Sequence, residues 1–135
     1  MEEQNLRIAS KSENLVLVEK LIENICKTFN ISEDFYGNIL VALTEAVNNA
    51  IQHGNKGNPE KTIDILFKPQ EGVISFIIKD QGDGFDYNNL PDPTDPENIE
   101  KLSGRGVFLM RNLADMVEFS DNGRTVALNF KISAN

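Results

Sequence analysis

The sequence predicts a two-layer α+β sandwich, in which a mixed, mostly antiparallel sheet carries helices on one face. Three observations support this fold class. Two segments with helical apolar spacing precede one pair of strand segments, a third helical segment precedes a second pair, and short turns join the strands of each pair. The chain has 135 residues, 40% hydrophobic and 25% charged, which is typical of one globular domain, so we expect a single domain over 1–135.

The first elements are a short strand at 4–9 and an amphipathic helix. Ser12 precedes this helix as a candidate N-cap, because its hydroxyl can accept a hydrogen bond from a free backbone N–H. Apolar residues then recur at helical spacing to about residue 29. Asn30 follows, and asparagine can end a helix in the left-handed conformation.

A second helix is predicted from Ser32 to about His53, with Gly54 after its end. One stripe of this helix is apolar and should face the core; it consists of Ile39, Leu40, Leu43, Ala46, Val47, Ala50 and Ile51. Glu45 and Asn49 lie on nearly the opposite side, one turn apart. A solvated polar face is the simpler interpretation of such a pair. Asparagine is nevertheless a poor helix former, so adjacent asparagines indicate another reason for their selection.

The second half of the chain contains two hairpins and a helix. The predicted elements are strands at 61–68 and 72–80, a helix at 107–115, and strands at 116–120 and 124–132. The Asn-Gly pair at 122–123 is a strong hairpin signal. Three prolines and four glycines in 81–106 exclude one regular element there, and a loop of this length is typical of a lid or binding loop.

Two glycine-rich segments flank this loop. In DQGDG (80–84), the glycines allow close approach of the backbone to a ligand, and Asp80 could accept a hydrogen bond from an adenine amino group. In SGRG (103–106), glycines precede a helix, whose free N–H groups favour an anion, and Arg105 can add a charge contact to phosphate. Taken singly, the first is an ordinary acidic turn and the second an ordinary hinge. Neither forms a Rossmann fingerprint or a Walker A loop.

Charge and cysteine content restrict the classes of partner and compartment. The formal net charge of −8 disfavours direct binding to nucleic acid or to anionic membranes, both of which require basic surfaces. One cysteine, Cys26, excludes an intramolecular disulfide and fits a reducing cytoplasm. The sequence has no apolar run long enough for a signal peptide or a membrane span, so we expect a cytoplasmic protein.

Taken in order, ALTEAVNNAIQHGN, DQGDGFD and SGRGVFLM resemble the N, G1 and G2 boxes of the Bergerat-type (GHKL) ATPases, the superfamily of gyrase and the histidine kinases. The resemblance spans about residues 36–119 and is greatest to the bacterial anti-sigma-factor serine kinases. It implies the Bergerat ATP-binding fold, ATP and Mg²⁺ as ligands, and protein-serine kinase activity. It also implies a homodimer and two partners, a sigma factor and an anti-anti-sigma protein of the STAS type.

The resemblance also implies roles for individual residues. Glu45 would be the catalytic base toward a serine hydroxyl, Asn49 would hold Mg²⁺, and 86–103 would form the ATP lid. Nucleotide contacts are implied for Asn49, Asp80, Gly82, Gly84, Lys101, Ser103, Gly104, Arg105, Gly106 and Val107. His53 matches a histidine common in the family, and a helix-capping role is as consistent with its place as a phosphate contact.

One position departs from the family pattern. Some relatives carry an arginine just before the Ser-Gly of the last box, where it reaches the γ-phosphate. Leu102 occupies that place here, beside Lys101, and Arg105 lies between the two glycines. The γ-phosphate contact is therefore open between these basic residues.

Three functions of different classes compete. The first is a protein-serine kinase that also sequesters a sigma factor. The second is a nucleotide-gated binding module without significant kinase activity, in which ATP orders a segment and changes partner affinity. The third, the catalytic half of a sensor histidine kinase, is disfavoured because the only histidine, His53, lies inside the N box. Gyrase-type hydrolysis is disfavoured because no transducer domain follows.

Overall fold

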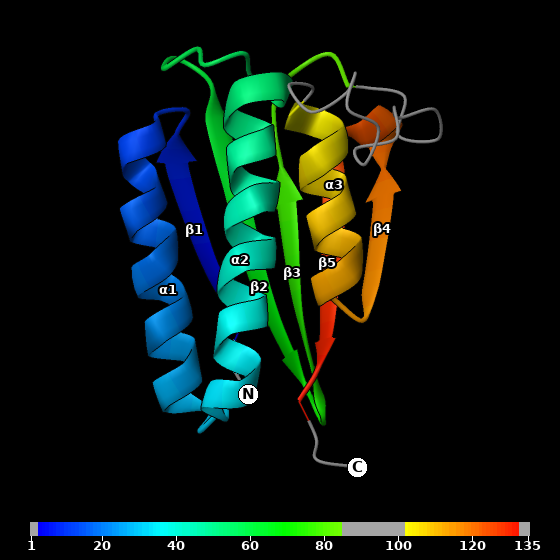
Figure 1. The fold of residues 1–135 in the computed structure, drawn as a ribbon. Helices are drawn as coiled ribbons and strands as arrows, with labels where there is room; N and C mark the ends of the chain where they lie inside the picture. The colour runs from blue at the N-terminus through cyan, green and yellow to red at the C-terminus, as the bar shows by residue number, and fades with distance from the viewer. Residues whose placement is uncertain (1–2, 85–101, 133–135) are drawn as a thin grey trace.

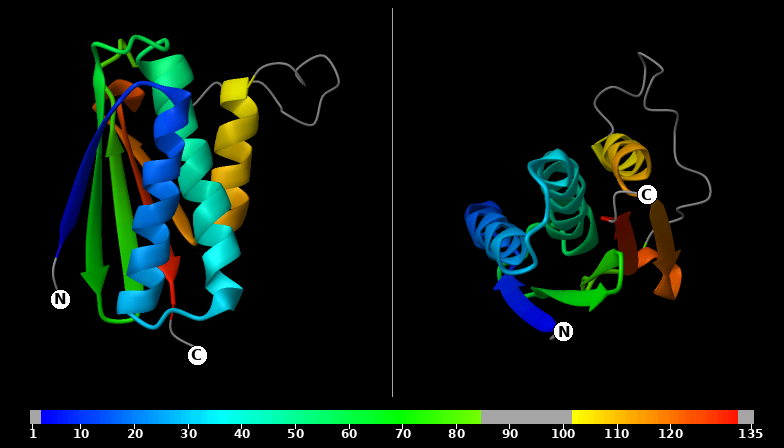
Figure 2. Two further views of the ribbon diagram at one scale, coloured as in Figure 1. Left: turned by 90° about the vertical axis from the view of Figure 1, so that its left-hand side faces the viewer. Right: turned by 90° about the horizontal axis from the view of Figure 1, so that it is seen from below.

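The computed structural model describes residues 3–84 and 102–132, which form an antiparallel sheet with three helices on one face (Figures 1 and 2). The strands are β1 (Gln4–Ala9), β2 (Thr62–Gln70), β3 (Val73–Lys79), β4 (Met116–Ser120) and β5 (Thr125–Lys131). The helices are α1 (Leu15–Thr28), α2 (Glu33–Asn49) and α3 (Leu102–Leu113). The predicted α+β sandwich is therefore confirmed.

The strands lie in the order β1-β2-β3-β5-β4, and all four pairings are antiparallel. The sequence predicts a mixed sheet, and β3 and β4, which a helix joins, are strands that could run in the same direction and pair in parallel. Figure 1 shows that they do run in the same direction, but β5 lies between them and pairs with both. The insertion of β5 thus removes the parallel pairing.

The core fills the layer between the sheet and the helices. On β2, β3 and β5 buried residues alternate with half-buried ones, as a sheet covered on one face requires. The buried strand side chains are Ile63, Ile65, Phe67, Ile74, Phe76, Ile78, Val126, Leu128 and Phe130. The predicted apolar stripe of α2 packs onto them, with all its members buried except the half-buried Leu40.

The predicted signals at the helix ends are confirmed in part. Ser32 caps α2, since its hydroxyl accepts a hydrogen bond from the Asp34 N–H at 3.2 Å. Asn30 is left-handed, with φ of 52°. The prediction for Ser12 is wrong: a 3-10 turn at Ser12–Asn14 precedes α1, and the Ser12 hydroxyl instead accepts a hydrogen bond from Gln52. Among the described residues, no helix combines the length and apolar character needed to cross a bilayer.

Candidate functional site

The end of α2 provides the first wall of the site. Sequence patterning predicts a helix to His53, but the α-helix ends at Asn49 and a π-helical turn, Ala50–Gly54, continues it. The Asn55 N–H accordingly donates to the Ala50 carbonyl five residues earlier, at 2.8 Å. Such wide turns are rare and often occur at functional sites. Here the turn places backbone and side chains of the helix end along a cavity.

The 80–84 segment packs against this π-helical turn with almost no free space. A Cβ atom added to Gly82 would lie 1.8 Å from the Gly54 carbonyl oxygen, and one added to Gly54 would lie 2.4 Å from Asp80 Oδ2. Both distances are far below van der Waals contact. Glycine is therefore required at both Gly54 and Gly82, because the two turns approach so closely that only hydrogen atoms fit between them.

A buried polar network holds the same two turns together. Asn55 is only 1% exposed, and its Nδ2 donates to the Ser10 hydroxyl at 2.7 Å and to the Thr62 carbonyl at 3.0 Å. Its Oδ1 accepts from the Gln81 N–H at 2.7 Å. One side chain thus joins the end of β1, the start of β2 and the 80–84 segment. Asn55 was not predicted, because an Asn after a Gly in a polar stretch is typical of an exposed turn.

The last box contributes through the start of α3. The predicted helix at 107–115 begins five residues too late, since α3 starts at Leu102 and contains Ser103–Gly106 in its first turns. Gly106 lies where neighbouring α2 leaves little room for a side chain. A Cβ atom on Gly106 would lie 3.0 Å from the Asn49 amide nitrogen. The N box and the last box are therefore in direct contact.

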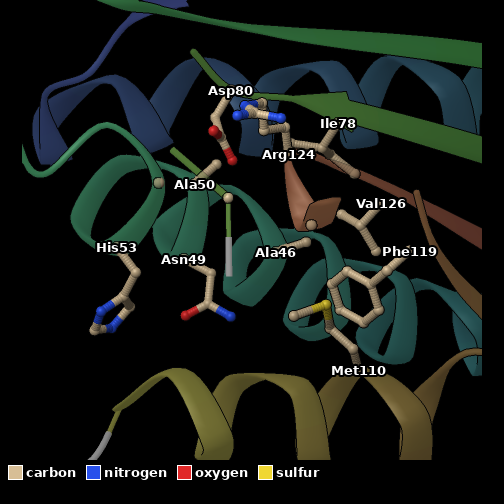
Figure 3. Close-up of a pocket in the computed structure, with 13 residues that line it drawn as sticks. Ala46, Asn49, Ala50, His53, Ile78, Asp80, Met110, Phe119, Arg124 and Val126 are labelled. Carbon is tan, nitrogen blue, oxygen red and sulfur yellow. The ribbon is translucent and has the colours of Figure 1, made fainter. Parts of the chain in front are cut away.

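These segments enclose one cavity of about 220 Å³ (Figure 3). Its walls are mostly apolar, with polar groups at the edges; they consist of Ala46, Asn49, Ala50, His53, Gly54, Ile78, Asp80, Gly84, Met110, Phe119, Gly123, Arg124 and Val126. The volume is below the roughly 300–1,000 Å³ of pockets for drug-sized ligands, so it suits a flat ring rather than a whole nucleotide. Apolar walls with a few polar groups are typical of a site for a heterocyclic base.

Asp80 is the acidic group of the cavity lining and lies at the rim. Burial raises the pKa of its carboxyl, while the hydrogen bond from the Gly82 N–H, at 2.8 Å, and the nearby Arg124 lower that pKa in part. The balance of these effects leaves the pKa above its ordinary value of 3.8. Figure 3 shows Asp80 and Arg124 side by side above the cavity. The carboxylate is thus a hydrogen-bond acceptor at the rim of an apolar pocket.

Four of the predicted residues meet around the cavity. Asn49, Asp80 and Gly84 line it, and Gly106 touches Asn49. Glu45 is half-buried on α2 one turn before Asn49, outside the cavity lining, and His53 lies on the lining with an exposed side chain. Lys101 and the part of the predicted lid up to residue 101 lie outside the described residues, whereas the lid's last two residues, 102–103, are helical.

Other lining residues were not predicted. Met110 and Phe119 form apolar walls, and Arg124 lies at the rim. Phe119 lies in the predicted strand 116–120, where an aromatic residue is common and carries no separate functional signal. Arg124 follows the Asn-Gly hairpin signal directly, where a basic residue is normally exposed.

The donor set near Asn49 fits magnesium only in combination with a phosphate ligand. No group of three His, Cys, Asp or Glu side chains that could hold a metal occurs in the described parts of the chain. Mg²⁺ usually keeps several waters and takes one or two protein oxygens together with substrate phosphates. The Asn49 amide oxygen, on the cavity wall beside α3, is suited to one such position.

Comparisons with known proteins identify the family of this chain. The model of the histidine kinase-like ATPase domain matches residues 8–130. The serine-protein kinase RsbW of Staphylococcus epidermidis is 30% identical over 131 residues, which cover 91% of this chain and 82% of that protein. RsbW of Staphylococcus aureus strain JH9 is similar to the same extent. The chain therefore belongs to the histidine kinase-like ATPase family and, within it, to the bacterial anti-sigma-factor serine kinases.

Proposed function

We propose that this chain is an ATP-dependent protein-serine kinase that also sequesters a sigma factor, and that it phosphorylates a serine of an anti-anti-sigma protein. One observation carries the proposal: three segments distant in sequence meet at one small apolar cavity, with a carboxylate at one end and Asn49 beside α3 at the other. The similarity to two proteins named as serine-protein kinases supports it.

In this proposal the cavity binds the adenine base. Ile78, Met110 and Phe119 cover its faces, and the Asp80 carboxylate accepts a hydrogen bond from the 6-amino group. Because the cavity accommodates little more than a base, the triphosphate would extend along Asn49 toward the start of α3. Backbone N–H groups at a helix start suit phosphate oxygens, which explains how an acidic chain can hold a polyanion.

Glu45 is proposed as the general base. It would accept the proton of the serine hydroxyl as the hydroxyl oxygen attacks the γ-phosphorus, while the bond from that phosphorus to the bridging oxygen breaks and ADP leaves. Magnesium held by Asn49 would neutralise charge on the phosphates. Glu45 lies on α2 one turn before Asn49 and does not line the cavity proposed for the base. This location is consistent with a role beside the phosphates.

The test separates nucleotide binding from phosphoryl transfer. Calorimetry with ATP, with and without Mg²⁺, measures binding, and radiolabel transfer to a purified cognate anti-anti-sigma protein measures catalysis. Glu45→Gln should retain ATP affinity within about twofold and lose about 10²–10⁴-fold in transfer rate. Glu60→Gln, at an exposed turn, is the matched control and should change neither quantity.

The outcomes distinguish the competing functions. Undiminished transfer by Glu45→Gln would reject Glu45 as the base. ATP binding by the wild type with no phosphate gained by the partner would favour the nucleotide-gated binding module. The proposal also includes a homodimer and a cytoplasmic location, which light scattering of the purified chain and cell fractionation would examine.

A further inference from the structure

Arg124 joins two turns that lie far apart in the sequence. It follows the turn Asp121–Gly123 and begins the segment that continues into β5. Its Nε donates to the Gly82 carbonyl at 2.7 Å, and its Nη2 donates to the Asp83 carbonyl at 3.3 Å. Its Nη1 donates to the Asp121 carbonyl at 3.2 Å. One guanidinium group therefore binds three main-chain carbonyls in two separate turns.

The same two turns also touch through their backbones. The Asp80 N–H donates to the Arg124 carbonyl at 2.9 Å. A Cβ atom on Gly84, whose φ is +85°, would lie 2.2 Å from the Asn122 carbonyl oxygen. The guanidinium thus holds the segment that follows β3 against the turn Asp121–Gly123. The planar guanidinium, with five N–H donors in a fixed arrangement, serves three separate carbonyls better than a lysine ammonium does.

This contact contributes to the surroundings of Asp80, together with burial and the hydrogen bond from the Gly82 N–H. Arg124 and Lys61 are the basic groups that act on its carboxyl, and Asp121, on the opposite turn, is the acidic one. His53 lies on the π-helical turn that packs against the 80–84 segment, and its side chain is exposed. The side chain of Arg124 is 31% exposed, so two-thirds of it is committed to the two turns and the cavity rim. Asp80, in turn, is the one carboxylate that lines the described cavity.

We propose that Arg124 is a positioning residue that fixes the 80–84 segment so that Asp80 faces the 6-amino group of adenine, and that it thereby sets the selectivity of the site for adenine over 6-oxo purines. This inference depends on the proposed ATP site. A residue that merely contributed stability would alter the affinities for all purine nucleotides together. A residue that orients Asp80 changes the ratio between ATP and inosine triphosphate, which lacks the amino group.

The experiment measures dissociation constants of ATP and inosine triphosphate, both with Mg²⁺, for the wild type, Arg124→Met and Arg124→Lys. The wild type should bind ATP at least about tenfold more tightly than inosine triphosphate, as expected for a hydrogen bond to a charged group. Arg124→Met should weaken ATP binding about tenfold and inosine triphosphate binding by less than about threefold. The ratio of the two dissociation constants should therefore fall toward one. Arg124→Lys should give an intermediate ratio.

Arg7→Met is the matched control. Arg7 is exposed on β1 and pairs with Asp64, with Nε 2.6 Å from Oδ1, on the sheet face that carries no helix. Its loss should leave both dissociation constants unchanged. Equal weakening of both nucleotides by Arg124→Met would overturn the positioning role, and so would unchanged affinities.

Amide hydrogen exchange without nucleotide gives a second, independent readout. Arg124→Met should accelerate exchange of the Asp80 and Gly82 amides, whose acceptors belong to this contact, and leave α1 unaffected. Unchanged exchange would overturn the inference. If the wild type bound neither nucleotide, the proposed function would fail and the base-selecting role with it, while accelerated exchange would still identify Arg124 as the clamp of the two turns.

Discussion

The two sides of the cavity are built from different kinds of contact. On the 80–84 side, glycines approach main-chain oxygens so closely that added Cβ atoms would lie 1.8 Å and 2.2 Å from the carbonyls of Gly54 and Asn122. On the α3 side, a Cβ atom on Gly106 would lie 3.0 Å from the end of the Asn49 side chain. Main-chain atoms in packed turns cannot move without distorting the fold, whereas a side-chain amide can rotate.

We therefore expect the two glycine-rich segments to respond differently to an added methyl group. The 80–84 side fixes the shape of the cavity proposed for the base and should be intolerant of any added atom. The α3 side contacts the movable side chain of Asn49, the proposed magnesium ligand, and should tolerate a methyl group at a cost in affinity rather than in stability. Substitutions at matched glycines can break or sharpen this comparison.

The largest effect is expected for Gly82→Ala. Its methyl group would overlap the Gly54 carbonyl oxygen, so the two turns must separate, at a cost of about 3 kcal/mol in the free energy of unfolding. Nucleotide binding should be abolished, because the cavity wall moves with the turn. Urea unfolding followed by circular dichroism measures the stability, and calorimetry with ATP measures the binding.

Gly37→Ala is the control for this substitution. Gly37 lies exposed in α2 with no atom within 4 Å of the added Cβ, so alanine should stabilise the protein by up to about 1 kcal/mol. ATP affinity should not change. A destabilisation of Gly82→Ala below about 1 kcal/mol, or wild-type ATP affinity in that variant, would contradict the rigid character assigned to this side.

Asp80→Asn is expected to have an intermediate effect with a pH signature. Burial raises the pKa of the Asp80 carboxyl, so the native state binds a proton more tightly than the unfolded state. Stability associated with this group is therefore present at low pH and lost as the pH rises from the ordinary value of 3.8 through the native pKa. The amide side chain of the variant does not ionise, so the variant should gain stability relative to the wild type over that range.

Nucleotide affinity should change in the opposite direction. Loss of the charged hydrogen-bond acceptor should weaken ATP binding by about tenfold or more at neutral pH. The measurement is the difference in unfolding free energy between variant and wild type from pH 3 to 7, combined with the ATP dissociation constant at pH 7. A difference that falls with rising pH would show that Asp80 stabilises the native state when charged and would reject the assigned environment.

The sequence alone predicted much of the fold, because its signals are local. Ser32, Asn30 and the Asn-Gly pair at 122–123 act through the backbone within a few residues, and each has the predicted conformation or lies in the predicted turn. Ser12 failed as a cap because its hydroxyl bonds instead to Gln52, a residue of a distant element. Local rules do not foresee such a competing partner.

The site followed the same division. Asn49, Asp80 and Gly84 were identified because their boxes are contiguous motifs, and the structure brings them to one cavity. Asn55 and Arg124 were not predicted, because their roles depend on long-range hydrogen bonds. The long-range partners of Asn55 lie 26 and 45 residues away in the sequence, and those of Arg124 lie 41 and 42 residues away. A side chain that clamps two turns has no sequence pattern of its own, so only three-dimensional contacts reveal it.

The smallest effect is expected for Gly106→Ala. The methyl group meets Asn49 at 3.0 Å, so the Asn49 amide must shift by a few tenths of an ångström. Alanine also favours the helix over glycine by up to about 1 kcal/mol, which offsets the crowding, so the unfolding free energy should stay within about 1 kcal/mol of the wild type. Displacement of the proposed magnesium ligand should weaken Mg²⁺-dependent ATP binding about three- to tenfold.

The dependence of ATP affinity on Mg²⁺ tests this explanation for Gly106→Ala. ATP titrations with Mg²⁺ and with excess chelator should show that Gly106→Ala loses affinity only when the metal is present, as Asn49→Ala should to a greater extent. Equal losses in both conditions would mean that the methyl group obstructs the nucleotide itself. The α3 side would then be a rigid wall like the 80–84 side, because a freely rotating Asn49 would have absorbed the added atom without narrowing the path of the ligand.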